Sequence, residues 1–217
     1  MPDHNLTKLE AVNRILRAAR EHPVSSLGST TQNDSLLAEQ ILDDVLTREQ
    51  MTGLHVNQTE ASFTRGADKK VLLPSNTLGV KGWNQHVQKN YYHKEVNGNV
   101  YLFDADHQPA TSDFSSAGAD EATAYVRITW RATFEELPAA YQFSIVDQSA
   151  VEYQEAVLGD NTLGAKLEQR AGRSRAIARS YDMRYRPKNQ IEDGRSNVQR
   201  SGMAVQRSWP YNDLRRQ

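Results

Sequence analysis

The chain has 217 residues, and its 26 basic and 27 acidic side chains leave a formal net charge of −1 at neutral pH. This length suits one domain or two small ones, and the total charge alone favours neither a basic nucleic-acid binder nor an acidic tail protein. Cysteine is absent, which excludes disulfides, thiolate metal sites and a thiol nucleophile.

Apolar residues are sparse. Val, Ile, Leu and Phe together make up about a fifth of the chain, near the level below which highly charged chains tend to be disordered. No apolar run approaches the roughly 18 residues that span a bilayer, so we expect a soluble protein without membrane contact. The core should be thin for this length, and a thin core is often completed by burial against other subunits.

The first fifty residues predict two helices. Thr7 and Glu10 have the spacing of a capping box, and the first helix should run from there towards Pro23, with Leu9, Val12, Leu16 and Ala19 at helical spacing. A second helix should extend from about Asp34 to Met51 and end at Gly53. Its expected apolar side consists of Leu37, Ile41, Val45 and Leu46. Two helices joined by a short loop should pack antiparallel.

After Gly53 the apolar residues no longer recur at helical spacing. Two β-rich runs, YYHKEV and VYLFD, flank Asn97-Gly98, a pair that tolerates positive φ and favours a tight hairpin. Residues 105–122 are polar and rich in Gly, Ser and Asp, which predicts a long loop, and the alternation in residues 125–130 indicates a half-buried strand. The GVKG segment at residues 79–82 is similar to a phosphate clamp, but a turn between strands is favoured.

Helical periodicity returns at Pro138, a residue suited to the first turn of a helix. The third helix should end at Gly159 and carry an apolar stripe of Phe143, Val146, Ala150, Tyr153 and Val157. A fourth helix, capped by Asn161 or Thr162, should end at Pro187, with Leu167, Ala171, Ala178, Tyr181 and Tyr185 on one side. Residues 187–217 show no sustained period.

These elements predict an α+β fold. The N- and C-terminal helix pairs, in residues 1–53 and 134–186, are expected to form an antiparallel four-helix bundle. Residues 54–133 would insert a small antiparallel β domain with its long loop at 105–122. Residues 187–217 would form an extended, basic C-terminal arm.

Charge is distributed unevenly along the chain. Residues 170–217 contain 12 basic and 4 acidic residues, a net charge of +8, whereas residues 1–169 contain 14 basic and 23 acidic residues, a net charge of −9. Eleven of the 12 basic residues are Arg, which suits bidentate contacts with carboxylate or phosphate. Such a segment can pair with copies of the chain, with an acidic protein surface or with nucleic acid. A solvated, mobile tail is the alternative interpretation.

No motif in the sequence indicates an enzyme. The common nucleotide-binding, hydrolase and zinc-protease patterns are absent, and the six histidines include no pair four residues apart. Asp104, Asp106 and His107 could bind a hard cation, but Asp is common in turns. We therefore expect no metal, no cofactor and no catalytic residue; a pocket around His93, Asp104 and His107 is the least supported alternative.

Three stretches carry a family resemblance: LEAVNRILRAAREHPVSSL in the first helix, VNGNVYLFD in the hairpin and FEELPAAYQFSIVDQSAVEYQ at the third helix. They resemble the tail tubular protein A family, the head-to-tail adaptors, or gatekeepers, of short-tailed phages. The resemblance covers nearly the whole chain up to about Tyr185. The arm after Pro187 and the loop at 105–122 contain no motif that aligns with the family.

The resemblance implies a structural protein of the virion tail that is assembled in the host cytoplasm. It would form a homo-oligomeric ring, expected to be a dodecamer, between the portal protein and a nozzle similar to tail tubular protein B. The ring would be a platform for tail assembly and a conduit through which DNA passes, without specific binding, during ejection. Contacts to the portal or a neighbouring subunit are expected from Arg173, Arg175, Arg179, Arg184, Arg186, Trp209 and Tyr211. The alternative function is a nucleic-acid-binding module that uses the same basic C-terminal segment.

Overall fold

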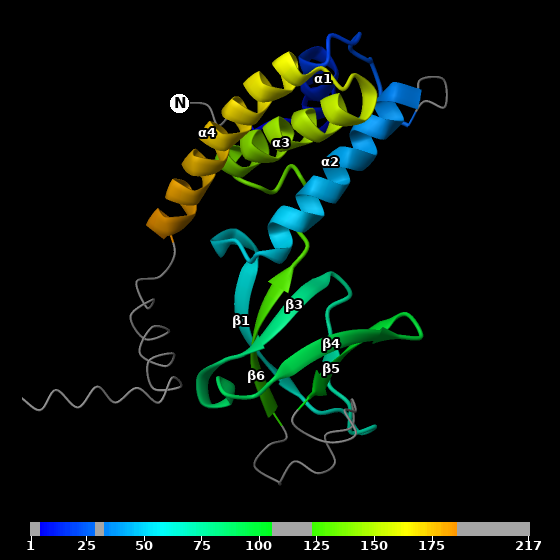
Figure 1. The fold of residues 1–217 in the computed structure, drawn as a ribbon. Helices are drawn as coiled ribbons and strands as arrows, with labels where there is room; N and C mark the ends of the chain where they lie inside the picture. The colour runs from blue at the N-terminus through cyan, green and yellow to red at the C-terminus, as the bar shows by residue number, and fades with distance from the viewer. Residues whose placement is uncertain (1–4, 29–32, 106–122, 186–217) are drawn as a thin grey trace, which may run out of the picture. The chain divides into compact units, whose positions relative to one another are not determined.

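The computed structural model describes residues 5–28, 33–105 and 123–185. The described residues up to Arg184 belong to one compact unit, and this part of the chain contains four α-helices and two small antiparallel sheets, which confirms the α+β class (Figure 1). The helices are α1 (Lys8–Ala18), α2 (Asn33–Met51), α3 (Ala139–Val157) and α4 (Asn161–Tyr185). The strands are β1 (Gln58–Thr64), β2 (Leu72–Leu73), β3 (Thr77–Gly82), β4 (Tyr91–Val96), β5 (Asn99–Asp104) and β6 (Thr123–Trp130). The expected C-terminal arm and residues 106–122 of the expected loop lie outside the described residues.

Helix α1 begins where the sequence predicts. The Thr7 hydroxyl accepts a hydrogen bond from the Glu10 N–H at 3.2 Å, and the Glu10 carboxylate accepts one from the Thr7 N–H at 2.9 Å. These two bonds satisfy amides that have no partner inside the helix, as a capping box does. The helix ends earlier than Pro23, because Arg20 already has a left-handed backbone with φ of 65°.

Helix α2 has nearly the predicted extent, and Val45 and Leu46 are buried as predicted, but the other two residues of the predicted apolar side are not. The structure only half-buries Leu37 and Ile41, and it buries Ala38 and Leu42 in their place. Leu37 and Ile41 each stand directly before an apolar residue, so the first half of the helix fits two apolar stripes that are one residue apart. Packing against α1 and α3 selects the second stripe. Gly53 follows the helix with φ of 78°, as expected for a glycine that ends it.

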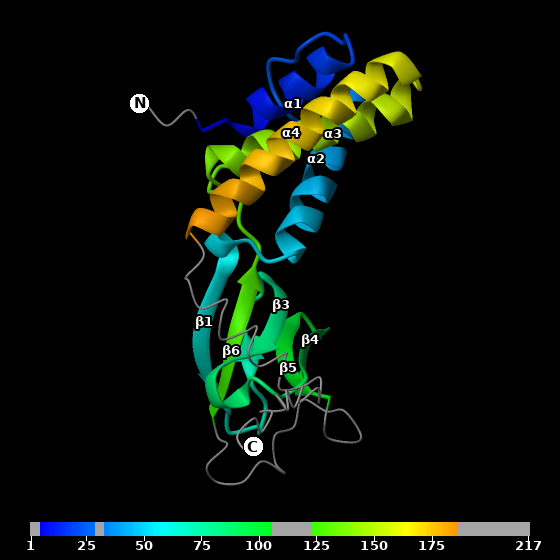
Figure 2. The ribbon, with the colours of Figure 1, turned by 60° about the vertical axis from the view of Figure 1, so that its left-hand side comes forward.

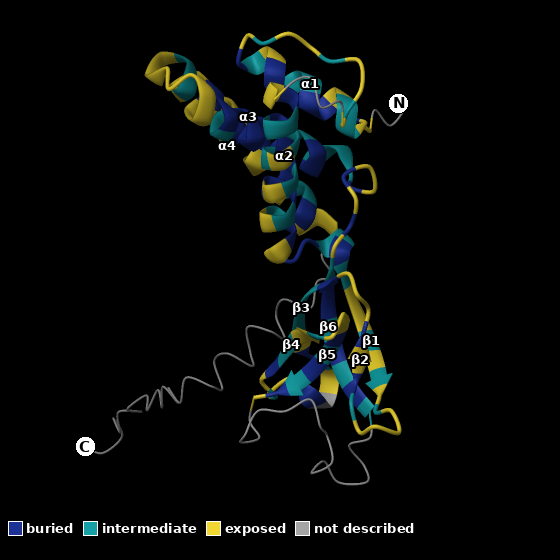
Figure 3. Cartoon of the chain, turned by 90° about the vertical axis from the view of Figure 1, so that its right-hand side faces the viewer, coloured by how far each residue is buried: buried dark blue, intermediate teal, exposed yellow. Residues whose placement is uncertain are grey.

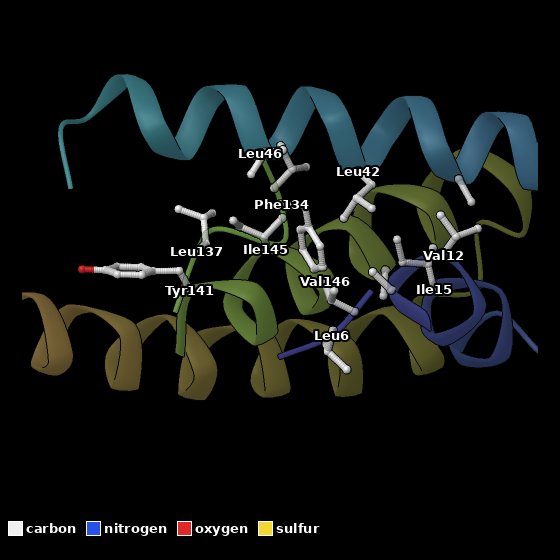
Figure 4. Packing of buried hydrophobic residues seen from close by; sticks show 14 of the residues in the cluster. Leu6, Val12, Ile15, Leu42, Leu46, Phe134, Leu137, Tyr141, Ile145 and Val146 are labelled. Carbon is white, nitrogen blue, oxygen red and sulfur yellow. The ribbon is translucent and has the colours of Figure 1, made fainter. Parts of the chain in front are cut away.

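Helix α3 is the central helix of the helical part. It packs against α1 and α2, and every residue from Ser144 to Ala150 is buried. Figure 4 shows α2 and α4 on opposite sides of the apolar cluster, with Ile145 and Val146 of α3 between them. The predicted stripe was therefore too narrow in the middle of α3, which is covered on almost every side, and wrong at its end, since Val157 is exposed.

Several polar side chains of α3 are buried together with the apolar ones, and Gln142 among them bonds to backbone groups. The Leu6 N–H donates to Gln142 Oε1 at 2.8 Å, and Gln142 Nε2 donates to the Phe134 carbonyl at 2.9 Å. A side-chain amide offers the same donor and acceptor as a peptide group. Gln142 therefore satisfies buried backbone groups on two segments and attaches both to α3.

Helix α4 is buried on one side only. Its buried residues are Leu167, Ala171, Ser174, Ala178 and Asp182. They recur every three or four residues, which is the spacing of a single helix face, and the remaining surface is mostly exposed. The helix begins one residue after Asp160, whose carboxylate accepts bonds from the Thr162 and Leu163 N–H groups at 2.8 and 3.2 Å. The predicted stripe is wrong at its end, since Tyr185 is 59% exposed.

The β part consists of two three-stranded antiparallel sheets, with strand orders β1-β6-β3 and β2-β5-β4 (Figure 2). The β4–β5 hairpin turns at Asn97 and Gly98, whose φ angles of 53° and 78° confirm the predicted tight turn. The two sheets share one apolar cluster of Val71, Leu73, Tyr91, Val100, Leu102, Ala124, Val126 and Ile128.

The structure corrects the prediction of a turn at GVKG, because these residues lie within strand β3. Gly82 is needed there for another reason: a Cβ at this position would lie 1.9 Å from the His86 carbonyl oxygen. Gly82 therefore reflects close approach of the backbone within the β part, not a turn or a phosphate clamp.

Buried amides connect the β part to the end of α2. Gln50 Nε2 donates to the Ala132 carbonyl at 3.0 Å, and the Ala132 N–H donates to Gln50 Oε1 at 2.7 Å. Asn57 Nδ2 donates to the carbonyls of Gln50 and Trp130, both at 3.1 Å. The segment between α2 and β1 is thus held to the segment after β6. The side-chain amides of Gln50 and Asn57 take the place of backbone hydrogen-bond partners in both segments.

Candidate interaction surface

The structure places four of the seven residues predicted to contact partners on one helix. Arg173, Arg175, Arg179 and Arg184 are all exposed on α4. The other three, Arg186, Trp209 and Tyr211, lie outside the described residues. The candidate surface that can be described is therefore the outer side of α4.

Two arginines of α4 contact α3 rather than facing only solvent. Arg170 Nε lies 2.9 Å from Asp147 Oδ1, and Arg175 donates to Gln148 Oε1. Asp147 and Gln148 are buried, so these contacts satisfy polar groups where α3 meets α4. Arg175 thus has a role inside the subunit that the sequence did not reveal, because its partner is 27 residues away.

Three other arginines of α4 form no ion pair with a described residue. These are Arg173, Arg179 and Arg184, and they are interspersed with Ile177 and Met183, which are 63% and 68% exposed. Arg173, Ile177 and Arg184 follow one another at intervals of four and seven residues, which places them along one flank of the helix. We call these five residues the outer face of α4. It combines unpaired positive charge with exposed apolar area.

A buried carboxylate fixes the C-terminal end of α4. Asp182 Oδ1 accepts hydrogen bonds from the Tyr141 hydroxyl at 2.6 Å and from the His55 N–H at 2.8 Å. His55 Nδ1 lies 3.1 Å from the same oxygen and 2.9 Å from the Tyr141 oxygen. Because Tyr141 gives its hydrogen to Asp182, its oxygen acts as an acceptor here, so Nδ1 carries a hydrogen in this arrangement. Sequence reasoning missed these three residues, which come from three distant segments.

An acidic group lies beside the start of α1. Lys8 Nζ is 2.8 Å from Glu39 Oε1 and 2.9 Å from Asp43 Oδ2 on α2, and the Lys8 N–H donates to Glu135 Oε1 at 3.0 Å. Burial alone would lower the pKa of Lys8, but the hydrogen bonds and attraction to Glu39 and Asp43 outweigh it and raise the pKa above its usual value. Two carboxylates, Glu39 and Asp43, therefore share one side-chain cation, and Glu135 is held beside them by a backbone N–H.

Two of the other residues considered for chemistry, His93 and Asp104, lie on the paired strands β4 and β5. Asp104 is buried at the end of β5, and burial lowers the pKa of His93 on the neighbouring strand. Asp106 and His107 lie outside the described residues. Among the residues that the structure describes, no group of three or more His, Asp or Glu side chains is positioned to hold a metal ion, and no helix is long and apolar enough to cross a membrane.

Comparison with known families gives one informative result. Residues 9–188 match the model of a family described as "Tail tubular protein". The match includes nearly all of the four helices and both sheets, and it contains the three stretches that carry the sequence resemblance. A comparison with curated proteins finds no match for the chain.

Proposed function

Because the chain belongs to the tail tubular protein family, we propose that it is the head-to-tail adaptor, or gatekeeper, of a short-tailed phage. Membership of this family makes it a structural component of a phage tail. The adaptor would form a ring of identical subunits, expected to be a dodecamer, assembled in the host cytoplasm. The portal protein would lie on one side of the ring and the tail nozzle on the other.

The observation that carries this proposal is the one-sided burial of α4. A 25-residue helix with six basic and two acidic side chains buries a single stripe, and its outer face holds Arg173, Arg179 and Arg184 beside exposed Ile177 and Met183. Arginine next to apolar area is characteristic of protein interfaces. Such a surface is consistent with a subunit whose burial is completed by other subunits.

The charge of the remaining chain suits a DNA conduit. Residues 1–169 carry a net charge of −9, and a negative lining cannot gain the counterion release that makes basic surfaces bind DNA tightly. DNA could therefore pass during ejection without being held by specific contacts.

The parts of the chain have separate roles in this proposal. The helices of residues 1–53 and 134–186 form a four-helix bundle that makes up the ring, and residues 54–133, with the loop at 105–122, are an insertion. The arm of residues 187–217 contacts the portal or the adjacent subunit. Trp209 and Tyr211 anchor it, because buried aromatic side chains contribute strongly to binding.

Imaging with and without a partner tests this function. Purified full-length protein is examined by negative-stain electron microscopy, alone and mixed with its candidate portal protein. We expect rings attached to the portal. A variant lacking residues 188–217 should keep the circular-dichroism spectrum and melting temperature of the full chain yet fail to attach. Normal attachment by the truncated protein would exclude the proposed role of the arm, and the absence of rings in both conditions would exclude the adaptor function.

Nucleic-acid binding is the alternative, and the exposed arginines of α4 are the observation in its favour. It predicts DNA affinity that falls steeply with salt, because each neutralised phosphate releases counterions. A gel shift at several salt concentrations separates the two functions. Absence of any shift up to micromolar protein would remove the alternative.

A further inference from the structure

We propose that the outer face of α4 docks onto the acidic side of α2 in a second copy of the chain, so that the subunits associate head to tail. This inference rests on the proposed function, since it states how the ring subunits would contact one another. The outer face of α4 is Arg173, Ile177, Arg179, Met183 and Arg184. The acidic side of α2 is Glu39, Asp43, Asp44 and Met51, together with Glu135, which Lys8 connects to it.

The two surfaces lie on opposite sides of the same core. Figures 1 and 4 show α2 on one side of α3 and α4 on the other, and side chains from both helices enter one apolar cluster. A subunit with a positive surface on one side and a negative surface on the other cannot pair both by a two-fold contact between identical patches. It can pair them by a heterologous contact, which closes into a ring when the rotation between subunits allows it.

The charges of the two helices are opposite. Helix α4 has six basic and two acidic residues, whereas α2 has five acidic residues and one basic residue, Arg48. Arg48 is already paired with Glu152 of α3. Asp44 is exposed and forms no ion pair with a described residue, and within the described part of the chain Lys8 is the one cation paired with Glu39 and Asp43. The acidic side of α2 therefore keeps a net negative charge that α4 of a neighbour can match.

The apolar residues indicate a protein partner rather than nucleic acid. Ile177 and Met183 are exposed on α4, and Met51, seven residues from Asp44 and hence on the same side of α2, is 62% exposed. Phosphates bind cations and hydrogen-bond donors and gain nothing from these side chains. An interface that combines apolar contact with surrounding arginine–carboxylate pairs uses all of them.

Charge reversal followed by mixing tests the pairing. One variant carries R173E, R179E and R184E, and the other carries D44K and E135K; all five positions are exposed. Each variant alone has two surfaces of like charge, so we expect at least about tenfold weaker association than for the wild type. In an equal mixture, each surface again meets one of opposite charge. We expect the mixture to recover rings in the microscope and the wild-type sedimentation coefficient.

A matched control makes the same change in net charge as the α4 variant, but in the β part. A variant with K69E, K81E and K94E reverses three exposed lysines of the β part and should assemble like the wild type. Circular dichroism and melting temperature establish that every variant is folded. Wild-type assembly should weaken as salt rises, because exposed ion pairs are screened.

Four results would overturn the inference. The α4 variant could assemble as the wild type does, which would leave the adaptor function intact but exclude this contact. The two folded variants could fail to recover ring assembly when they are mixed. The α4 variant could instead assemble normally and lose only portal or DNA binding, which would assign the outer face of α4 to that partner. If the wild type forms no ring with or without portal, the adaptor function and this inference fail together.

Discussion

Helices α3 and α4 follow each other in the chain but are stabilised in different ways. In α3, every residue from Ser144 to Ala150 is buried, and buried polar groups such as Gln142 bond to backbone of other segments. In α4 one stripe is buried and the opposite surface is exposed; Figure 3 shows the exposed turn where α3 passes into α4. The middle of α3 is thus enclosed within the subunit, whereas α4 leaves one side exposed, which is the surface that we propose for a partner.

The largest difference is expected from the same substitution in the two helices. Ile145 of α3 is 1% exposed and packs in the central cluster, whereas Ile177 of α4 is on the outside. We expect Ile145→Ala to reduce the free energy of unfolding by about 2–5 kcal/mol, because it removes buried methyl groups and leaves a cavity. Ile177→Ala should change it by no more than about 0.5 kcal/mol. Urea unfolding of both variants measures this, and equal losses would contradict the comparison.

A smaller loss of stability is expected from a substitution of Asp182, which fixes the C-terminal end of α4. Replacing Asp182 by Asn removes the charge that strengthens the hydrogen bonds from Tyr141 and His55. We expect a loss of about 1–3 kcal/mol, with faster amide hydrogen exchange in the last turns of α4 and unchanged exchange in α1.

The control for this prediction is Glu168→Gln, which removes the other acidic charge of α4 from an exposed position. It should leave both stability and exchange unchanged. If Asp182→Asn exchanged like the wild type throughout α4, the buried carboxylate would not be what holds the end of this helix.

The smallest change in stability at neutral pH is expected from a substitution of Tyr153 in α3. Its hydroxyl is buried without a hydrogen-bond partner among the described residues. Burial raises the pKa of Tyr153 to about 12, and Asp34 and Glu21 add repulsion of the phenolate. The folded state thus holds the proton more tightly than the unfolded state, whose tyrosine pKa is about 10. This contribution is complete below pH ~10 and is lost as the pH rises towards about 12.

Tyr153→Phe therefore should change stability at pH 7 by less than about 1 kcal/mol, since it removes an unsatisfied hydroxyl. Because Phe does not ionise, the variant should also avoid up to about 3 kcal/mol of the loss of stability that the wild type shows between pH ~10 and ~12. Unfolding free energies measured across this range test the difference, with Tyr185→Phe on the exposed side of α4 as the control. Parallel curves for the wild type and Tyr153→Phe would show that Tyr153 does not titrate differently in the folded state.

Short sequence motifs correctly predicted the features whose structure depends on residues nearby in the chain. The capping box at Thr7 and Glu10, the tight turn at Asn97-Gly98 and the glycine after α2 were confirmed, because each depends on hydrogen bonds or φ angles within a few residues. The charge of α4 was likewise apparent from sequence. Strands β1 and β3 were missed, since β1 is mostly polar and β3 is rich in glycine, and both are defined by pairing with β6.

The sequence by itself determined where the chain becomes helical or extended, how its charge is divided and which family it resembles, because composition and spacing carry this information directly. Only the tertiary structure decided which of two adjacent stripes α2 buries, that α3 is enclosed, and that Asp182 meets Tyr141 and His55. These outcomes depend on packing between segments that are far apart in the chain. Burial of a side chain is fixed by what covers it, and a periodic pattern cannot specify which other element that will be.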